Sequence, residues 1–571
     1  MSEHDFSKMD ACVVSIEVDG RQRYIFETDK LKEMLGASRI IANTVRETLE
    51  LMTKYGEVRM LQPASGDIKM WAPITGRHQL LSLVWEMREW LAERGVEHTV
   101  SYLEAPRKHF EDERSGPALP VNRNSSPKDP NLGWIHGELR RKGGRQKSDE
   151  ATADASPRCS LFAGCQLDAQ DSANEWHSKQ GSEIRRQLRG YRSAKKFDAW
   201  MKDRGTFLER IYESAKQIGP VDWQFDSLKD FPDDDDEGRS GDSYLAYICL
   251  DGDGLGTLIR EIDWNQAPVW TGDGMERNPW RRNRTFSEEL DQVTHNAYRD
   301  ALVEVIRSKA AQKYLPNIPA LPHLLGGDDL WTVCRKDVAF DLCRSFTERL
   351  KEAIRSTTVL KQALSNRELT FSFGIAFAKA GYPAHALIDA AESLLSSAKG
   401  LREDRLSQPG HVPEACVDWY WIESSLVESV KEAQEAATIF RDGAETFHLT
   451  TRPWTVSQTE AFQKALEHFR TVPRRKREQL DEILRHTRLR SLLYWEGWTK
   501  RLLREERDAM AEVRSTLRSG AGIDLPAPMG DEWASGVVDF MPWIKRTNEG
   551  RPVFVTPLLD LLSLDDVMGA L

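Results

Sequence analysis

The 571-residue sequence has few cysteines, no long hydrophobic run and no excess of basic residues. Its seven cysteines are too few and too scattered for the disulfide framework of a small secreted protein, so we expect a reducing, cytoplasmic setting. No apolar stretch approaches the ~20 residues that span a bilayer, and the first residues do not resemble a signal peptide, so we expect no membrane partner. A net charge of −11 also argues against a protein that coats nucleic acid over its whole surface.

The chain is long enough for several domains, because one domain usually has ~100–200 residues. Composition and hydrophobic periodicity divide it into four segments. Residues 1–110 and 241–410 are each predicted to form an α+β domain. Residues 111–240 are predicted to be an irregular insertion and a helical connector with an acidic linker, and residues 411–571 a mainly helical domain.

The two α+β domains are predicted to share the element order β-α-β-β-α-β, which is ferredoxin-like. The helix after the first strand of the second domain is expected to open with a capping box of Thr285 and Glu288. In the first domain, strands are expected at 11–18, 58–61, 68–71 and 97–103, and helices at 28–51 and 77–94. In the second, strands are expected at 244–250, 321–325, 330–333 and 369–377, with further helices at 338–354 and 383–399.

Acidic residues follow the first strand of the second α+β domain and occupy its hairpin turn, at DGDG 251–254 and GGDD 326–329. The first strand and the hairpin are neighbours in this fold, so Asp251, Asp328 and Asp329 are expected to converge. Carboxylates so close together repel each other unless cations neutralise them, and hard oxygen ligands favour Mg²⁺ or Mn²⁺. Two such ions can activate a ribose 3′-hydroxyl and stabilise a departing pyrophosphate. This chemistry is nucleotidyl transfer, although either motif alone is more often a calcium-like or plain turn.

Small and basic residues around these carboxylates are candidates for binding a triphosphate. Glycines let main-chain amides approach phosphate oxygens closely. A lysine near the end of the last helix is a candidate cation for the same phosphates, and a solvated lysine is the alternative. The candidate nucleotide-binding residues of this domain are Gly252, Asp253, Gly254, Gly326, Gly327 and Lys399.

These motifs resemble the CRISPR polymerase/cyclase family, the large palm-domain subunit of type III CRISPR effectors, and more distantly the GGDEF nucleotide cyclases. The resemblance rests on YLAYICLDGDGLG at 244–256, LPHLLGGDDLWTVC at 321–334 and the strand-helix unit at 371–400. YIFETDKLKEMLGASRII at 24–41 is similar to the first, degenerate palm of that family.

The resemblance implies two ferredoxin-like palm domains plus a C-terminal mainly helical domain. It implies an enzyme that joins ATP molecules 3′ to 5′ into cyclic or linear oligoadenylate messengers for antiviral defence. Asp251, Asp328 and Asp329 would then be the catalytic residues and the ligands of Mg²⁺ or Mn²⁺, with Asp253 less certain. The expected partner is ATP; guide and target RNA, other effector subunits and a second copy of the chain are left open.

The sequence departs from the family pattern in its first palm and at its start. Ser65-Gly66-Asp67-Ile68 stands where the second palm has its GGDD turn, which implies one active site per chain. Ser38 or Asp67 could touch an acceptor nucleotide held by the first palm, although structural roles are favoured for both. The pair His4-Asp5 is followed directly by the first strand, so we expect no metal nuclease domain and no DNase activity.

Two further segments offer weaker signals. Cys159 and Cys165 lie in the insertion, where relatives can bind zinc, but a structural zinc site needs four ligands, so a solvated loop is favoured even though His136 and His177 could complete the set. Basic and aromatic residues in 473–507 could hold RNA, or could form an exposed helix with internal ion pairs.

Two other functions compete with catalysis. The chain could be a non-catalytic palm-domain scaffold that binds nucleotide, RNA or protein partners in a type III CRISPR-like complex. Carboxylates kept at every expected metal position argue against a scaffold, because buried unpaired charges are costly. A diguanylate-type cyclase is the least favoured function, because Asp329 and Leu330 stand where that motif has Glu and Phe.

Overall fold

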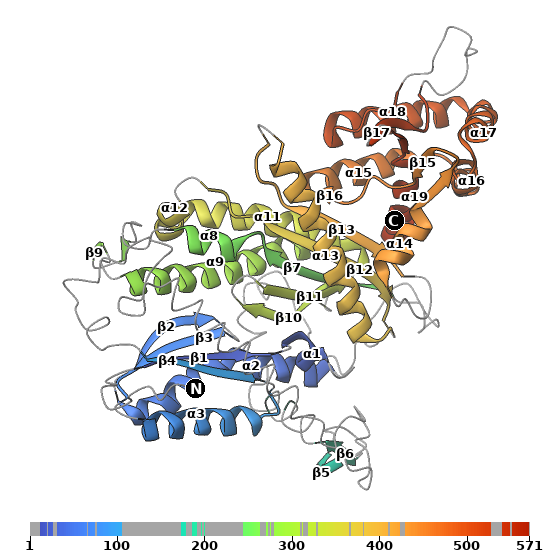
Figure 1. The fold of residues 1–571 in the computed structure, drawn as a ribbon. Coiled ribbons are helices and arrows are strands. Elements are labelled where there is room, and N and C mark those ends of the chain that lie inside the picture. The colour runs from blue at the N-terminus through green and yellow to red at the C-terminus, as the bar shows by residue number, and fades with distance from the viewer. Residues whose placement is uncertain are drawn as a thin grey trace.

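The structure is a computed structural model of the chain (Figure 1). It describes residues 12–19, 21–26, 31–56, 58–64, 67–74, 77–96, 98–104, 173–178, 186–190, 196, 199, 244–262, 270–271, 274–275, 279–308, 311, 318–326, 329–364, 367–380, 382–408, 411–422, 429–526, 540–548 and 551–569.

The N-terminal domain is a four-stranded antiparallel sheet with the strand order β2-β3-β1-β4. This order confirms the predicted ferredoxin-like connectivity, and the short helix α1 is an addition to it. The central strand β1 is buried at every residue except Glu17, which explains its β-branched, apolar composition. The elements are β1 (Cys12–Val18), α1 (Arg21–Phe26), α2 (Leu31–Met52), a 3₁₀ turn (Thr53–Tyr55), β2 (Arg59–Ala64), β3 (Asp67–Ala72), α3 (Arg77–Ala92) and β4 (His98–Glu104).

The second palm-like domain repeats this order in its strands β10-β11-β7-β12. Its central strand β7 pairs antiparallel with β11 on one side and β12 on the other. The elements are β7 (Tyr244–Gly252), α8 (Leu255–Glu261), β8 (Trp270–Thr271), β9 (Gly274–Met275), α9 (Pro279–Arg307), β10 (Ala320–Gly326), β11 (Asp329–Arg335), a 3₁₀ turn (Lys336–Val338), α11 (Ala339–Ser356), α12 (Thr358–Leu364), β12 (Phe371–Lys379) and α13 (Ala384–Leu406).

The predicted start of helix α9 is wrong. The helix begins at Pro279, whose fixed φ suits the first helical position, so Thr285 lies inside the helix and caps nothing. Glu288 accepts a hydrogen bond from Arg284 at 2.7 Å, as residues four apart on a helix surface do. The helices α8 and α12 were not expected, because seven-residue helices carry too little periodicity to detect.

The sheet of the second domain continues beyond residue 410. Strand β13 (Cys416–Trp421) pairs parallel with β12, and the short β16 (Trp454–Thr455) pairs with β13 at the sheet edge. The C-terminal region therefore shares a sheet with the domain before it, and the division at 410/411 stays a prediction.

The rest of the C-terminal region is mainly helical, as predicted, with a small sheet of order β14-β15-β18-β17 that was not predicted. Helix α15 has a capping box, in which Thr455 and Gln458 satisfy each other's backbone amides. The elements are α14 (Val430–Thr438), β14 (Ile439–Asp442), β15 (Glu445–His448), α15 (Val456–Phe469), α16 (Arg474–Leu484), α17 (Arg488–Lys500), α18 (Arg504–Ala521), β17 (Ile544–Asn548), β18 (Arg551–Val555) and α19 (Leu558–Met568).

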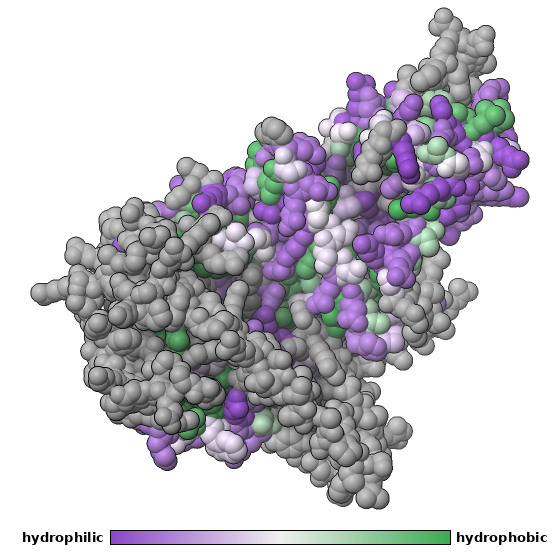
Figure 2. Space-filling model, viewed as in Figure 1, coloured by the Kyte–Doolittle hydropathy of each residue, from purple (hydrophilic) through white to green (hydrophobic). Residues whose placement is uncertain are grey.

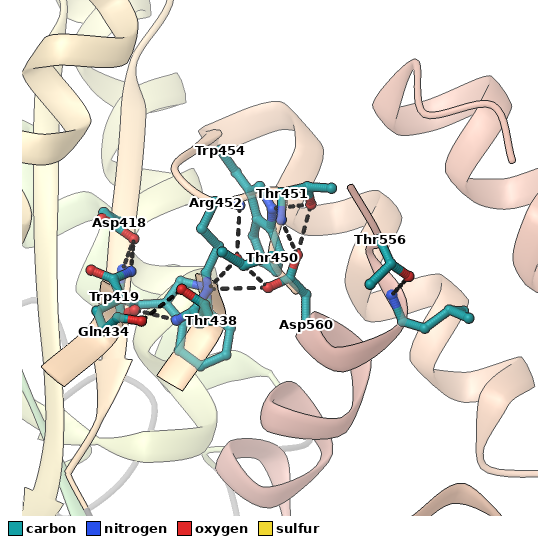
Figure 3. A network of polar contacts seen from close by, with 11 residues as sticks. Asp418, Trp419, Gln434, Thr438, Thr450, Thr451, Arg452, Trp454, Thr556 and Asp560 are labelled. Carbon is teal, nitrogen blue, oxygen red and sulfur yellow. Dashed lines mark hydrogen bonds and ion pairs between the residues drawn. The ribbon is translucent and has the colours of Figure 1, made fainter. Parts of the chain in front are cut away.

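A buried polar network fixes α19 against the end of the palm sheet (Figure 3). Asp560 accepts hydrogen bonds from the hydroxyls of Thr450 at 2.6 Å and Thr451 at 2.7 Å, and pairs with Arg452 at 3.1 Å. Arg452 also donates to the carbonyl oxygen of Trp419 in β13. Because Asp560 and Arg452 neutralise each other and are hydrogen-bonded to both sides, these contacts hold the C-terminal region against the sheet.

Within the insertion the structure describes Lys196, Ala199 and a hairpin of β5 (Ala173–Ser178) and β6 (Arg186–Gly190). Cys159, Cys165 and His136 lie outside the described residues. No helix in the described part of the chain is long and apolar enough to cross a membrane. Figure 2 shows a mostly hydrophilic surface over the C-terminal helices, with a hydrophobic patch at α17, where Leu489 and Leu493 are exposed.

The first domain packs against the second through its helices and one edge strand. Helix α2 contacts β10, helix α1 contacts α13, and strand β2 contacts α9. In Figure 1, α1 and α2 (blue) lie beneath β10, β11 and α13. Helices α1 and α2 are thereby brought close to the hairpin of β10 and β11.

Candidate functional site

Two of the predicted carboxylates lie at the same end of neighbouring strands. Asp251 is near the end of β7 and Asp329 is the first residue of β11. The antiparallel register pairs Leu250 with Leu330, which sets the two aspartates next to each other. Gly326 pairs with Asp329 across the hairpin, whereas Gly327 and Asp328 lie outside the described residues.

Each of these carboxylates is paired with a cation of the chain. The ammonium of Lys399, on α13, binds the Asp251 carboxylate, and Arg21 Nη2 lies 2.9 Å from Asp329 Oδ2. Burial and the charge of Asp251 raise the pKa of Asp329 above its usual value, although Arg21 and Lys399 act to lower it. The lysine predicted from sequence therefore reaches the site, and the arginine is a contact that sequence reasoning missed.

Asp253 points into the fold and not toward the other carboxylates. Its oxygens accept hydrogen bonds from Thr370 at 2.8 Å and Ser372 at 2.7 Å, and Arg402 lies 3.3 Å away. Its side chain is 1% exposed, and burial raises its pKa even though these donors act to lower it. The residue ties the loop after β7 to the start of β12.

The two glycines that follow Asp251 and Asp253 have different structural roles. Gly254 has a φ of +66° and precedes the first turn of α8, a left-handed conformation that favours glycine. Gly252 is the last residue of β7 and pairs with Phe371. The positive φ of Gly254 is what lets the chain turn directly from the strand into the helix.

Glu392 is a further acidic residue of the site that sequence reasoning missed. It lies on α13, two turns before Lys399, and so on the same helix face. Burial, Asp389 and Asp329 raise its pKa, in that order. The seven-residue spacing between Glu392 and Lys399 could have indicated that both lie on the same helix face. The spacing alone does not predict a site residue, because a glutamate on a helix is usually solvated.

The site has the donor type that Mg²⁺ or Mn²⁺ takes, namely carboxylate oxygens at an accessible strand end. Among the described residues, no three His, Cys, Asp or Glu side chains are close enough together to hold a metal ion. Asp251 and Asp329 are adjacent, and Asp328 lies outside the described residues, so the metal site formed by these three residues stays a prediction.

The two candidates of the first palm, Ser38 and Asp67, lie on α2 and β3. Ser38 is a buried residue of α2, and no hydrogen bond among those of the described residues joins it to Asp251 or Asp329. Asp67 is the first residue of β3 and pairs with Glu17 of β1.

The basic segment 473–507 is largely occupied by internal contacts. Lys476 binds Glu506 at 2.6 Å, Arg485 binds Asp481 at 2.8 Å, and the buried Arg477 binds Asp565. Trp495 is fully buried and unable to stack on a base. These pairings favour the solvated-helix interpretation over an RNA-binding surface.

Comparison with known proteins gives a family for part of the chain. Residues 244–407 match the family model described as Cas10/Cmr2, second palm domain. The comparison with curated proteins found no match.

Several solved structures are similar in outline. They include a Csm1–Csm4 cassette in complex with AMPPNP (14% identity, TM-score 0.39), an apo Csm1–Csm4 cassette (12%, 0.44) and Csm1 from T. onnurineus (14%, 0.39). The matches cover 69%, 90% and 70% of this chain and 54%, 66% and 53% of those chains, respectively. The chain thus spans less than two thirds of each, and likenesses this weak support no functional conclusion.

Proposed function

Because residues 244–407 match the family model of the Cas10/Cmr2 second palm domain, we propose that this chain is a metal-dependent nucleotidyltransferase of CRISPR-type antiviral defence. It joins ATP molecules 3′ to 5′ into cyclic or linear oligoadenylates. The observation that supports this most is the adjacency of Asp251 and Asp329 at the ends of β7 and β11. The catalytic unit is then 241–410, and 1–110 is a degenerate palm.

The reaction forms one phosphodiester bond per step. The 3′-oxygen of one ATP attacks the α-phosphorus of another, the bond from that phosphorus to pyrophosphate breaks, and the hydroxyl proton passes to solvent. A Mg²⁺ or Mn²⁺ pair held by Asp251, Asp328 and Asp329 would supply Lewis-acid activation of the hydroxyl and charge neutralisation of the pyrophosphate.

The other residues of the site bind and orient the nucleotide. Lys399 already lies on Asp251, so its ammonium can move to a phosphate oxygen when the carboxylate binds a cation. Glycines at 252, 254, 326 and 327 would let main-chain amides approach phosphate oxygens closely. Asp253 acts through the loop that it anchors to Thr370 and Ser372, and not on the substrate.

The test is product formation by single-residue variants. The purified chain is incubated with each labelled nucleoside triphosphate and Mg²⁺ or Mn²⁺, and products are identified by mass. We expect oligoadenylate from the parent chain and from the control Asp67→Ala, and none from Asp251→Asn or from Asp328→Ala with Asp329→Ala. Product from a correctly folded double variant would refute the assignment of the carboxylates.

A non-catalytic scaffold is the second candidate, and one observation favours it. Lys399 and Arg21 neutralise Asp251 and Asp329 from within the chain, so the carboxylates do not need a metal to be stable. A scaffold would bind ATP without forming product, even when RNA or other effector subunits are added. Product under any of these conditions would exclude it.

A further inference from the structure

The ion pair between Arg21 and Asp329 joins two domains and lies inside the candidate site. Arg21 is the first residue of α1 in the first domain, and Asp329 is the first residue of β11 in the second. Their side chains are 30% and 20% exposed, so the contact is partly shielded from water. A charge-assisted contact of this kind is stronger than an exposed surface ion pair.

Arg21 and Leu255 hold the same position in their two domains. Each is the first residue of the helix that follows a central strand, and each stands third after the last residue of that strand, Val18 in β1 and Gly252 in β7. Strands β1 and β7 hold the same place in their sheets. Where the second domain has a buried leucine, the first has a cation that extends across the interface.

We propose that Arg21 is a phosphate-binding residue that the first domain supplies to the site of the second. Before substrate binds, its guanidinium neutralises Asp329. When a divalent cation takes the Asp329 carboxylate, the guanidinium is released and binds phosphate oxygens of the nucleoside triphosphate, to which its planar fork is suited. This inference rests on the proposed function, and it gives the first domain a direct part in substrate binding although it lacks its own GGDD turn.

If Arg21 exchanges Asp329 for phosphate in this way, replacing it should change the affinity for the metal ion and the affinity for the nucleotide in opposite directions. Replacing Arg21 removes a competitor for Asp329, so the affinity for Mn²⁺ without nucleotide should rise by about tenfold. The same change removes a phosphate ligand, so the affinity for a non-hydrolysable ATP analogue in saturating Mn²⁺ should fall by about tenfold. A residue that only supported the fold would weaken both.

The experiment measures both affinities on the full chain. Mn²⁺ binding is followed by the loss of the free-ion paramagnetic resonance signal, and analogue binding by calorimetry, for the parent, Arg21→Met and Arg21→Lys. Lysine keeps the charge but not the fork, so it should leave Mn²⁺ affinity near that of the parent and restore analogue affinity only in part. Arg46→Met is the matched control, because Arg46 lies on α2 and pairs with Glu50 at the surface.

The outcomes separate this inference from the proposed function. Opposite shifts in Arg21→Met support it, even if the parent forms no oligoadenylate. Shifts of the same sign, or none, overturn it, even if the parent makes product. A parent chain that binds neither Mn²⁺ nor the analogue overturns both.

Discussion

The stability of the β10–β11 hairpin should depend on pH through His323. This residue lies in the middle of β10, the strand that leads to the GGDD turn, and its side chain is fully buried. Its ring stacks near that of Tyr247 in β7, with 6.4 Å between centroids. Burial lowers the pKa of His323 to about 4, because the strand has no room to solvate an imidazolium.

The size of the effect follows from the difference between folded and unfolded pKa. An unfolded histidine titrates near pH 6.5, so above that pH both states are neutral and the group adds no pH dependence. Between pH 6.5 and 4 the unfolded state binds a proton that the folded state does not, so stability falls as the pH falls. The loss is about 2 kcal/mol at pH 5 and levels off at about 3 kcal/mol below pH 4.

Hydrogen exchange of the β10–β11 hairpin measures this directly. The free energy of opening is compared at pH 7.5 and pH 5 in the parent, in His323→Gln and in the control His411→Gln, which changes an exposed residue. Between pH 7.5 and pH 5, the free energy of opening should fall by about 2 kcal/mol more in the parent than in His323→Gln. The control His411→Gln should show the same fall as the parent. An equal fall in the parent and in His323→Gln would refute the linkage.

Three further changes test the packing and the surfaces. Gly374→Ala would set a Cβ 2.0 Å from a backbone oxygen of α13, so the free energy of unfolding, measured by thermal unfolding, should fall by ~1–3 kcal/mol or more. The Cβ added by Gly400→Ala meets open space on the same helix, so this variant should be more stable by up to ~1 kcal/mol. Asp560→Asn leaves the buried Arg452 without its counter-ion and should cost ~3–5 kcal/mol in urea unfolding; a cost below 1 kcal/mol would contradict the network. Arg475→Glu changes an exposed residue among cations that are already paired, so RNA retention on filters should stay unchanged at low and high salt; a loss confined to low salt would support an RNA surface.

The strands of both palms could be predicted because their apolar residues have to be buried. YLAYICL is apolar throughout, and in the structure β7 lies in the centre of a six-stranded sheet. The tight turn at GGDD could be predicted because glycine and aspartate, which favour turns, stand between two apolar runs. In the same way, the approach of Lys399 to Asp251 followed from a helix that had to pack on β12 and β7.

What could not be predicted depends on contacts between elements far apart in the chain. Asp251 and Asp253 look equivalent in sequence, yet one lies at the open strand end and the other is enclosed by Thr370 and Ser372, 117 and 119 residues later than Asp253. The pairing of Arg21 with Asp329 exists only because α1 and α2 dock beside β10 and α13. Local patterns carry no information on such docking.

The two palms together explain why one chain would keep a domain without a GGDD turn. Two facing aspartates at a sheet end are stable only if positive charge lies nearby. Lys399 supplies one charge from the second palm, and Arg21 supplies the other from the first. Loss of the first domain would therefore leave Asp329 with a neighbouring Asp251 and one cation fewer, and would open one wall of the site to solvent.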